Sequence, residues 1–346
     1  MNKGIFFIPI NKQDKENDIL LDEIVSETIN AEKFGIQEAF YGEHITDKHE
    51  KISSSLMMVS ALTTVTNNIK LGTLTTNLNF HKPATLAAMI SQVDNLSKGR
   101  LMLGIGCGAN MSDVEAIDML DKNNHKIMLE TFDILKKIFN KKSPFNIETE
   151  NFKVSTEKNF NSELGLGYFN NLYKNRKDLE IVMPALNKNS YNVKICAENN
   201  WNIVISNFCS HEIIDNHIDS YIKHSKLKKK EALKKIKLSK LIFVTENSNQ
   251  ASEFLSKDDS PYLNVVDILY RKLKTFNKHD CFGENISNSR EALENIAIYG
   301  SPTDVKKKLE YYNDKYGDLS SIVYVSVPKT DNKIFENSLE LFAKYV

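Results

Sequence analysis

Short apolar runs and longer segments of helical periodicity alternate along this chain, and this alternation restricts its fold more than any other feature. A short run such as Glu38–Tyr41 predicts a buried strand, whereas Ile19–Phe34 carries apolar residues at helical spacing and is closed by Gly35. Strands and helices that alternate through short connections are typical of parallel βα units. The sequence therefore predicts an α/β protein.

The same patterns give eight predicted strands and about as many main helices. The predicted strands are Gly4–Ile8, Glu38–Tyr41, Ile69–Thr75, Leu101–Ile105, Glu180–Ala185, Asn202–Ser206, Leu238–Thr245 and Ser321–Ser326. The predicted helices are Ile19–Phe34, Ser55–Thr66, Thr85–Leu96, Tyr191–Asn199, Glu212–His224, one from Gln250, one that begins after the N-cap Ser301, and Lys333–Tyr345. Eight such strands fit a closed (β/α)8 barrel, the TIM barrel, better than an open sheet.

One barrel domain over residues 1–346 accounts for the whole length if two segments are insertions. Residues 143–178 lack a clean period and fall between the fourth and fifth predicted strands, and residues 257–299 precede the last βα unit. No internal repeat is visible in the sequence. We therefore expect a single barrel with insertions around 143–178 and 257–299.

Composition narrows the class of protein. Basic and acidic residues number 45 each, and this balance disfavours a nucleic-acid-binding protein, which usually carries a basic excess. The four cysteines lie far apart without a CxxC pair, as suits a reducing compartment. The first apolar run, from Ile5, is too short for a signal peptide, and no stretch approaches the ~18 apolar residues of a membrane span. We expect a soluble, cytoplasmic protein.

Lys226–Lys237 contains seven lysines and one glutamate. It could be an anion-binding patch, but Leu227, Ala232, Leu233 and Ile236 give it a modest apolar stripe. We therefore interpret it as the solvated face of a helix.

Polar and glycine residues gather where the predicted strands end, which is where barrel enzymes place their chemistry. The segments that follow strands two to six are Gly42–His44, Thr75–Asn77, Gly106–Asn110, Asn187–Ser190 and Ser206–Asn207. Parallel strands in a barrel end on the same side. These segments therefore predict one site at the carboxyl end of the barrel.

His44 and Glu43 are the first candidates for chemistry at this site. The imidazole of His44 could donate to an oxyanion or act as an acid or base near neutral pH, although it could also only cap the next helix. Glu43 could be a general base or a structural partner for a backbone N–H or a lysine. The other histidines show no HExxH or similar spacing, so we expect no metal site.

The glycine-rich segment Gly104–Gly108 is a poor dinucleotide fingerprint, because it lacks the later glycine and the acidic ribose partner. Gly106 and Gly108 could instead let the backbone approach a flat ligand. Cys107 has no base close in sequence, which argues against a covalent thiol mechanism. Asn189-Ser190 precedes a helix and could bind a phosphate or act as a plain N-cap.

Several segments together resemble the bacterial luciferase-like flavin monooxygenase superfamily. They are FGIQEAFYGEH, IKLGTLTTNLNFHKP, AAMISQVDNLSKGRLMLGIGCGA and YGSPTDVKKKLEYY. The most specific is the ordered set D-x-x-S-x-G-R-x-x-x-G-I-G-x-G from Asp94 to Gly108. GIGCGANMSDVEAIDM and SNFCSHEIIDNHIDSY are most similar to the alkane/limonene-type monooxygenase branch.

This resemblance implies a dimeric (β/α)8 barrel that takes reduced FMN from a separate flavin reductase and uses it with O2 on a small, largely apolar organic substrate. It implies that His44 is catalytic. The residues that it implies for cofactor binding are Glu43, Thr75, Asn77, Cys107, Gly108, Asn189, Ser190 and Ser206. Luciferases carry an arginine where this chain has Gly108, so the cation for the flavin phosphate is unassigned, with Lys188 and then Lys126 as candidates.

Three alternatives stay open. One is a deazaflavin-dependent hydride-transfer enzyme of the same fold, and another is a non-catalytic, flavin-binding luciferase-like subunit. The third is a barrel hydrolase, which needs two acids at strand ends, and Glu43 has no evident mate.

Two features bear on partners. No segment resembles a nicotinamide site, so the flavin is expected to arrive already reduced. The helices Ser55–Thr66 and Thr85–Leu96 are apolar around much of their circumference, which indicates a homodimer unless neighbouring helices of the same chain cover them.

Overall fold

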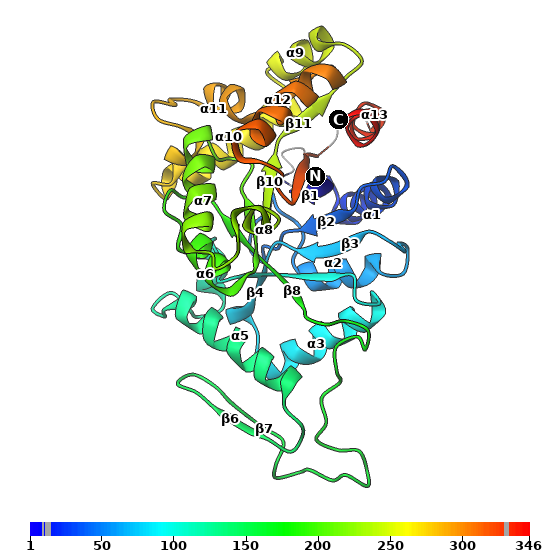
Figure 1. Cartoon of the computed structure of the whole chain (residues 1–346), viewed down its shortest axis with the longest axis vertical. Coiled ribbons are helices and arrows are strands. Elements are labelled where there is room, and N and C mark those ends of the chain that lie inside the picture. Colours follow the sequence, from blue (N-terminus) through cyan, green and yellow to red (C-terminus); the bar gives the residue numbers. More distant parts are fainter. Residues whose placement is uncertain (9, 11–14, 329–331) are drawn as a thin grey trace.

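The computed structural model describes residues 1–8, 10, 15–328 and 332–346. Eight parallel strands form a closed barrel, because β3 pairs with both β2 and β5 and completes the circle. In order around the barrel, the strands are β3 (Lys70–Thr73), β2 (Glu38–Tyr41), β1 (Asn2–Phe7), β13 (Ser321–Ser326), β10 (Ile236–Lys240), β9 (Asn202–Ile205), β8 (Glu180–Ala185) and β5 (Leu101–Gly106). The predicted TIM barrel is confirmed (Figure 1).

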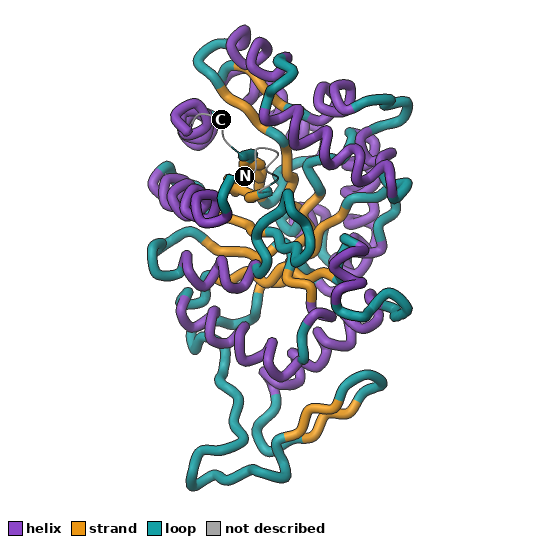
Figure 2. Tube along the Cα trace, turned by 180° about the vertical axis from the view of Figure 1, so that it is seen from behind, coloured by secondary structure: helices purple, strands orange, loops and turns teal. Residues whose placement is uncertain are grey.

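Helices surround this barrel on the outside, as Figure 2 shows in purple around the orange strands. They are α1 (Asn17–Lys33), α2 (Ser55–Leu62), α3 (Pro83–Leu96), α4 (Met111–Ala116), α5 (Asn124–Asn140), α6 (Tyr191–Asn199), α7 (His211–His224), α8 (Lys229–Leu233), α9 (Ser248–Ser256), α10 (Pro261–Thr275), α11 (Ser289–Ile296), α12 (Pro302–Tyr316) and α13 (Asn332–Tyr345). Two short 3-10 helices, η1 (Leu78–Phe80) and η2 (His279–Phe282), lie in connections.

Helix ends follow the local sequence signals. Ser301 and Asp304 form a reciprocal capping box at the start of α12, with Pro302 at the first helical position. At the carboxyl end of α1, Gly35 has φ +88, a conformation that glycine adopts without strain. Both signals were read correctly from the sequence.

The inside of the barrel is filled by alternate residues of the strands, as strand geometry requires. A compact apolar cluster of Phe40, Leu74, Met102, Val182, Val204 and Val323, with Phe6 packed against it, occupies the barrel interior. A larger cluster packs the outward strand residues against the helices. The interior cluster forms the floor on which any site at the carboxyl end must rest.

The predicted strand Leu238–Thr245 is divided in the structure, so its prediction was wrong in one respect. β10 ends at Lys240 and stays in the barrel, whereas β11 (Ile242–Val244) leaves it and pairs with β12 (Ile298–Gly300). The apolar run is continuous, and the partner of β11 lies far along the chain. A local pattern therefore could not show the break.

The lysine-rich segment also differs from the expectation. Only Lys229–Leu233 is helical, as α8, and Ile236 begins β10. Lys237 is buried inside the barrel, where its Nζ lies 2.6 Å from Oε2 of Glu38. Successive side chains of a strand point to opposite sides, and that of Lys237 points into the barrel. The lysines before it gave no sign of this.

The two expected insertions have different structures. Residues 143–178 contain the antiparallel pair β6 (Asn146–Glu148) and β7 (Lys153–Ser155) and project away from the barrel (Figure 1). Residues 257–299 are mostly helical, through α10 and α11, and they contribute Leu269 and Lys278 to a cavity at the barrel mouth. Among the described residues, no helix combines the length and the apolar character needed to cross a membrane.

Candidate active site

A cavity of about 380 Å³ opens at the carboxyl end of the barrel. Its floor includes Phe6, Leu74 and Val204 of the interior cluster. Six of the residues expected at the site line it together, namely Glu43, His44, Thr75, Asn77, Ser190 and Ser206. Segments that are far apart in sequence therefore meet at the carboxyl end of the barrel, as their positions after the strands predicted.

His44 is held from one side by a buried carboxylate. Its Nδ1 lies 2.8 Å from Oδ2 of Asp113, which is on α4, and its Nε2 lies 3.5 Å from Oε2 of Glu50. Burial disfavours the charged imidazole, but the hydrogen bond with Asp113 and the negative charges of Glu50 and Asp47 outweigh it and raise the pKa of His44. The ring therefore holds a proton more firmly than an ordinary histidine.

Asp113 is fixed in its ionised form. Burial alone would raise its pKa, but hydrogen bonds from His44 and from the backbone and hydroxyl of Thr46 lower it. An ionised acceptor on Nδ1 keeps a proton on that nitrogen, which leaves Nε2 as the atom that can exchange a proton. Nothing near His44 in the sequence indicated Asp113, because the two residues meet only in the fold.

A second ion-pair group ties this loop to the helical insertion. Lys272 of α10 contacts Asp47 and also lies 3.1 Å from Glu50. The two carboxylates outweigh burial of the ammonium and raise the pKa of Lys272. The insertion therefore helps to fix Glu50 beside His44.

Glu43 uses both carboxylate oxygens within the protein. Its Oε2 accepts from the backbone N–H (3.0 Å) and hydroxyl (2.8 Å) of Ser55, and its Oε1 accepts from the backbone N–H of Asn77 (2.8 Å). These bonds join the start of α2 to β4 (Thr76–Asn77). These bonds fit the considered role of Glu43 as a structural partner for a backbone N–H, and Glu43 also lines the cavity.

Thr75, Asn77 and Gly108 form one connected wall. The side-chain oxygen of Asn77 accepts from the backbone N–H of Gly108 (3.0 Å) and from the hydroxyl of Thr75 (3.1 Å). The peptide bond between Leu74 and Thr75 is cis. The wall is thus fixed by hydrogen bonds across β4 and the end of β5.

The glycines of this wall also allow close packing within the chain. A Cβ at Gly106 would overlap the hydroxyl of Thr75, and a Cβ at Gly108, where φ is +80, would lie 2.7 Å from the ring of Phe80. Both glycines therefore permit close packing of the chain against itself. The expectation that they let the backbone approach a flat ligand stays a prediction.

Three predicted cofactor residues, Cys107, Gly108 and Asn189, do not line the cavity. Burial raises the pKa of the Cys107 thiol, and the positive charge of Lys278 opposes this only in part, so the thiol stays protonated. The backbone N–H of Asn189 donates to Oδ1 of Asn216 of α7 (2.8 Å), and Oδ1 of Asn189 accepts from Nδ2 of Asn216 (2.9 Å). Asn189 thereby fixes the turn that leads into Ser190.

The start of α6 offers an anion site beside the cavity. Ser190 is the N-cap of this nine-residue helix, but its hydroxyl makes no capping bond and lines the cavity instead. Free backbone N–H groups and the helix dipole favour a phosphate at such a position.

The two lysines considered for the phosphate are engaged elsewhere. Lys188 pairs with Glu212, Lys126 pairs with Glu150, and neither lines the cavity. Among the described residues, Lys278 is the only lysine or arginine that does. It belongs to the insertion 257–299, whose sequence gave no sign of a role at the site.

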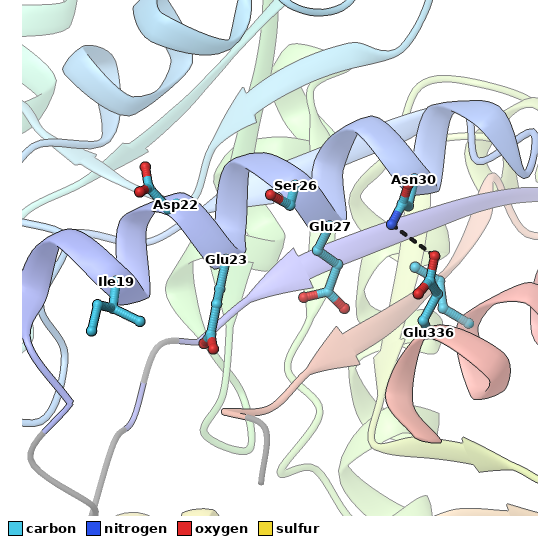
Figure 3. A pocket seen from close by; sticks show the side chains of 8 residues that line it. Ile19, Asp22, Glu23, Ser26, Glu27, Asn30 and Glu336 are labelled. Atoms are coloured by element: carbon cyan, nitrogen blue, oxygen red, sulfur yellow. Dashed lines mark hydrogen bonds between the residues drawn. The ribbon is translucent and has the colours of Figure 1, made fainter. Parts of the chain in front are cut away.

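Another cavity, of about 430 Å³, lies outside the barrel between α1 and α13 (Figure 3). Its wall carries the carboxylates of Asp22, Glu23, Glu27 and Glu336. Glu23, Glu27 and Glu336 bond to Lys15, Ser326 and Asn30 respectively. A wall of this charge would repel a phosphate, so we assign the site to the barrel mouth.

Comparison with known proteins finds similarity to monooxygenases. The family model described as "Luciferase-like monooxygenase" matches residues 1–162. 2,5-Diketocamphane 1,2-monooxygenase 1 of Pseudomonas putida is 25% identical over 96% of this chain and 94% of that protein. Limonene 1,2-monooxygenase of Rhodococcus erythropolis is 26% identical over 39% of this chain and 35% of its own.

Solved structures show the same fold. The oxygenating constituent of 3,6-diketocamphane monooxygenase from Pseudomonas putida, a type II Baeyer-Villiger monooxygenase in complex with FMN, superposes with a TM-score of 0.88. It is 21% identical, and the match covers 99% of this chain and 97% of that one. The coenzyme F420-dependent tetrahydromethanopterin reductase of Methanopyrus kandleri has a TM-score of 0.67 and 16% identity, over 100% of this chain and 98% of its own. The resemblance recognised in the sequence is therefore confirmed by the family model over residues 1–162 and by the similarity to 2,5-diketocamphane 1,2-monooxygenase 1 along most of the chain.

Proposed function

We propose that this protein is an FMN-dependent monooxygenase that uses reduced FMN and O2 to oxygenate a small, largely apolar organic substrate. One observation carries the proposal. The cavity at the carboxyl end of the barrel brings a carboxylate-held histidine, a polar wall and a helix N-terminus to one place. A relative with the same fold holds FMN, and curated relatives are named as monooxygenases.

The chain's own groups fit FMN. The start of α6 with Ser190 suits the phosphate, and Lys278 supplies a positive charge to the same cavity. The wall of Thr75 and Asn77 and the apolar floor of the cavity would hold the flavin ring. Reduced FMN, when bound, supplies two electrons to O2, so that one oxygen atom enters the substrate and the other leaves as water.

His44 acts on the proton side of this reaction. Asp113 holds Nδ1, so the imidazolium can donate from Nε2 or stabilise negative charge that develops during oxygen transfer. The raised pKa of His44 favours the form that carries this proton.

The rest of the lining excludes water and selects the substrate class. Phe7, Ile8, Leu186, Phe208 and Leu269 present apolar side chains to the cavity. Exclusion of water protects a reactive oxygenating species from hydrolysis and favours an apolar substrate.

The partners follow from the same proposal. A separate flavin reductase supplies the reduced FMN, because no dinucleotide fingerprint is present. The homodimer forms through α2 and α3. Most of their apolar residues pack inside the chain, but Met57 remains 74% exposed, and Val65 and Leu96 are exposed nearby. The four cysteines are free, which suits the cytoplasm.

A rival cofactor is favoured by one observation, the shared fold of F420-dependent enzymes. The deciding experiment is an anaerobic titration of the protein with reduced FMN and, in parallel, with reduced F420. The FMN complex is then mixed with ¹⁸O-labelled O2 and a panel of apolar substrates. We expect tight binding of reduced FMN only and ¹⁸O in a product. Binding of F420 alone, or FMN binding without an oxygenated product from any substrate, would overturn the proposal.

A further inference from the structure

Two residues that line the cavity carry buried polar atoms without hydrogen-bond partners. Of ten buried side-chain N or O atoms without a hydrogen-bond partner in the described part of the chain, only Nδ2 of Asn207 and Oγ of Ser239 belong to residues that line this cavity. Both side chains are about 99% buried, at 1% exposure each. Proteins rarely leave such groups unpaired, because burial removes their hydrogen bonds to water.

The two groups belong to neighbouring strands. β9 and β10 are parallel, and Ile205 at the end of β9 lies opposite Leu238. Ser239 therefore lies beside the end of β9, and Asn207 follows two residues after that end. Ser239 alternates with Leu238 and therefore shares the inward face of β10 with Lys237. The pair thus occupies one side of the cavity, on the β9–β10 wall, whereas His44 and Thr75 come from the β2 and β3 ends.

The surroundings restrict what the pair can bind. The interior cluster beneath the cavity, which includes Phe6, Leu74 and Val204, is wholly apolar. The neighbouring Lys240 is turned outward, where it donates to the backbone oxygen of Cys209 at 3.3 Å. Lys278 and His44 come from other walls of the cavity, and neither the apolar cluster nor Lys240 offers a counter-ion on the β9–β10 wall, so the expected ligand group there is neutral.

An amide N–H and a hydroxyl can both donate, and the two lone pairs of one carbonyl oxygen can accept both. We propose that Asn207 and Ser239 form a two-donor subsite for the carbonyl oxygen of an apolar ketone or aldehyde. The inference rests on the proposed function, because it concerns the substrate of that same cavity. It makes these two residues determinants of specificity and orientation.

The subsite gives a specific form of discrimination. A site built to satisfy a polar group rejects an analogue without that group strongly, because its own donors are then buried unpaired. Apolar contacts alone distinguish such isosteres weakly. The protein should therefore prefer a ketone over the hydrocarbon of the same shape.

The test uses norcamphor and 2-methylenenorbornane, which differ only in a carbonyl oxygen against a methylene group. Binding of each to the full chain loaded with oxidised FMN is measured by calorimetry, so no turnover is needed. The variants are Ser239→Ala, Asn207→Leu and the double variant. Ser260→Ala is the matched control, because Ser260 also has a buried hydroxyl without a partner but does not line the cavity.

We expect norcamphor to bind the unaltered protein roughly tenfold or more tightly than the hydrocarbon. Each single variant should weaken norcamphor binding by about three- to tenfold, and the double variant should abolish the preference. FMN affinity and hydrocarbon affinity should hardly change, and Ser260→Ala should behave like the unaltered protein. The ligand-free variants should melt at the same temperature or higher, because an unpaired buried group has been removed.

Three results would overturn the proposal. Equal losses for both probes would assign the pair to packing. Weaker FMN binding with an unchanged ketone preference would assign the donors to the cofactor. No change in any affinity would leave the pair to trapped water. A clear ketone preference in a protein that oxygenates nothing would instead contradict the proposed function and leave the subsite intact.

Discussion

The two ends of the barrel differ in how completely their buried polar groups are paired. At the amino end, the carboxylate of Glu38 accepts from Lys237 at 2.6 Å and from the hydroxyl of Ser321 at 2.5 Å. At the carboxyl end, Asn207 and Ser239 have buried polar atoms without partners. The comparison indicates that the amino end contributes stability, whereas the carboxyl end gives up stability for binding and chemistry.

The largest effect is expected when the ion pair at the amino end is broken. Lys237→Met leaves Glu38 buried without its cation, which should lower the free energy of unfolding by about 3–5 kcal/mol. The pair of Lys70 with Glu180 is the control, because Lys70 is exposed and its loss should cost under about 1 kcal/mol. Denaturant titration measures both, and FMN affinity should be unchanged. If the loss of either lysine lowered the free energy of unfolding by the same amount, the buried ion pair at the amino end would not be a special source of stability.

At the carboxyl end, His44→Ala should affect rate and not stability. We expect oxygenation to slow about a hundredfold or more, because the proton or the positive charge of His44 acts mainly in the transition state. FMN binding should weaken much less. Single-turnover kinetics and flavin titration separate the two quantities. If both fell by the same factor, His44 would be a binding residue only.

Asp113→Asn tests the role of the carboxylate that bonds to Nδ1 of His44. Loss of its charge and of one of its two acceptor oxygens should lower the pKa of His44 toward its ordinary value, as read from the imidazole signals by NMR. Because the folded-state pKa is raised, protonation of His44 stabilises the fold below about pH 6.5, and this stability disappears as the pH rises through the folded-state pKa.

The variant should therefore show a weaker loss of stability over that pH window than the unaltered protein, by about 1.4 kcal/mol for each unit by which the pKa falls. Thr46 also bonds to Asp113, so a uniform loss of stability at every pH is expected in addition. An unchanged pKa of His44 would show that Glu50 and Asp47 suffice to raise it.

The smallest effect is expected at Cys107. Burial raises the pKa of its thiol, and the side chain does not line the cavity, so Cys107→Ser should leave oxygenation nearly unchanged. Complete inactivity with FMN still bound would show that the thiol acts in the reaction after all.

The sequence predicted most of the barrel, because each strand carries its own local signal. The bounds of β2, β8, α6 and β13 match those predicted. The pairing of β11 with β12 could not be predicted, because it joins segments that are distant along the chain.

The site was predicted less completely. Strand ends located His44, Thr75 and Ser190, since such positions converge in any parallel barrel. Asp113 and Lys278 were missed, because their roles arise only from tertiary contacts with residues far away in the sequence.

The most direct test of the comparison is a crystal structure of the protein with FMN. We predict the flavin ring beside Thr75 and His44 and the phosphate at the start of α6 near Ser190, all at the carboxyl end of the barrel. Flavin bound at the amino end, beside Glu38 and Lys237, would contradict the assignment of function to the carboxyl end.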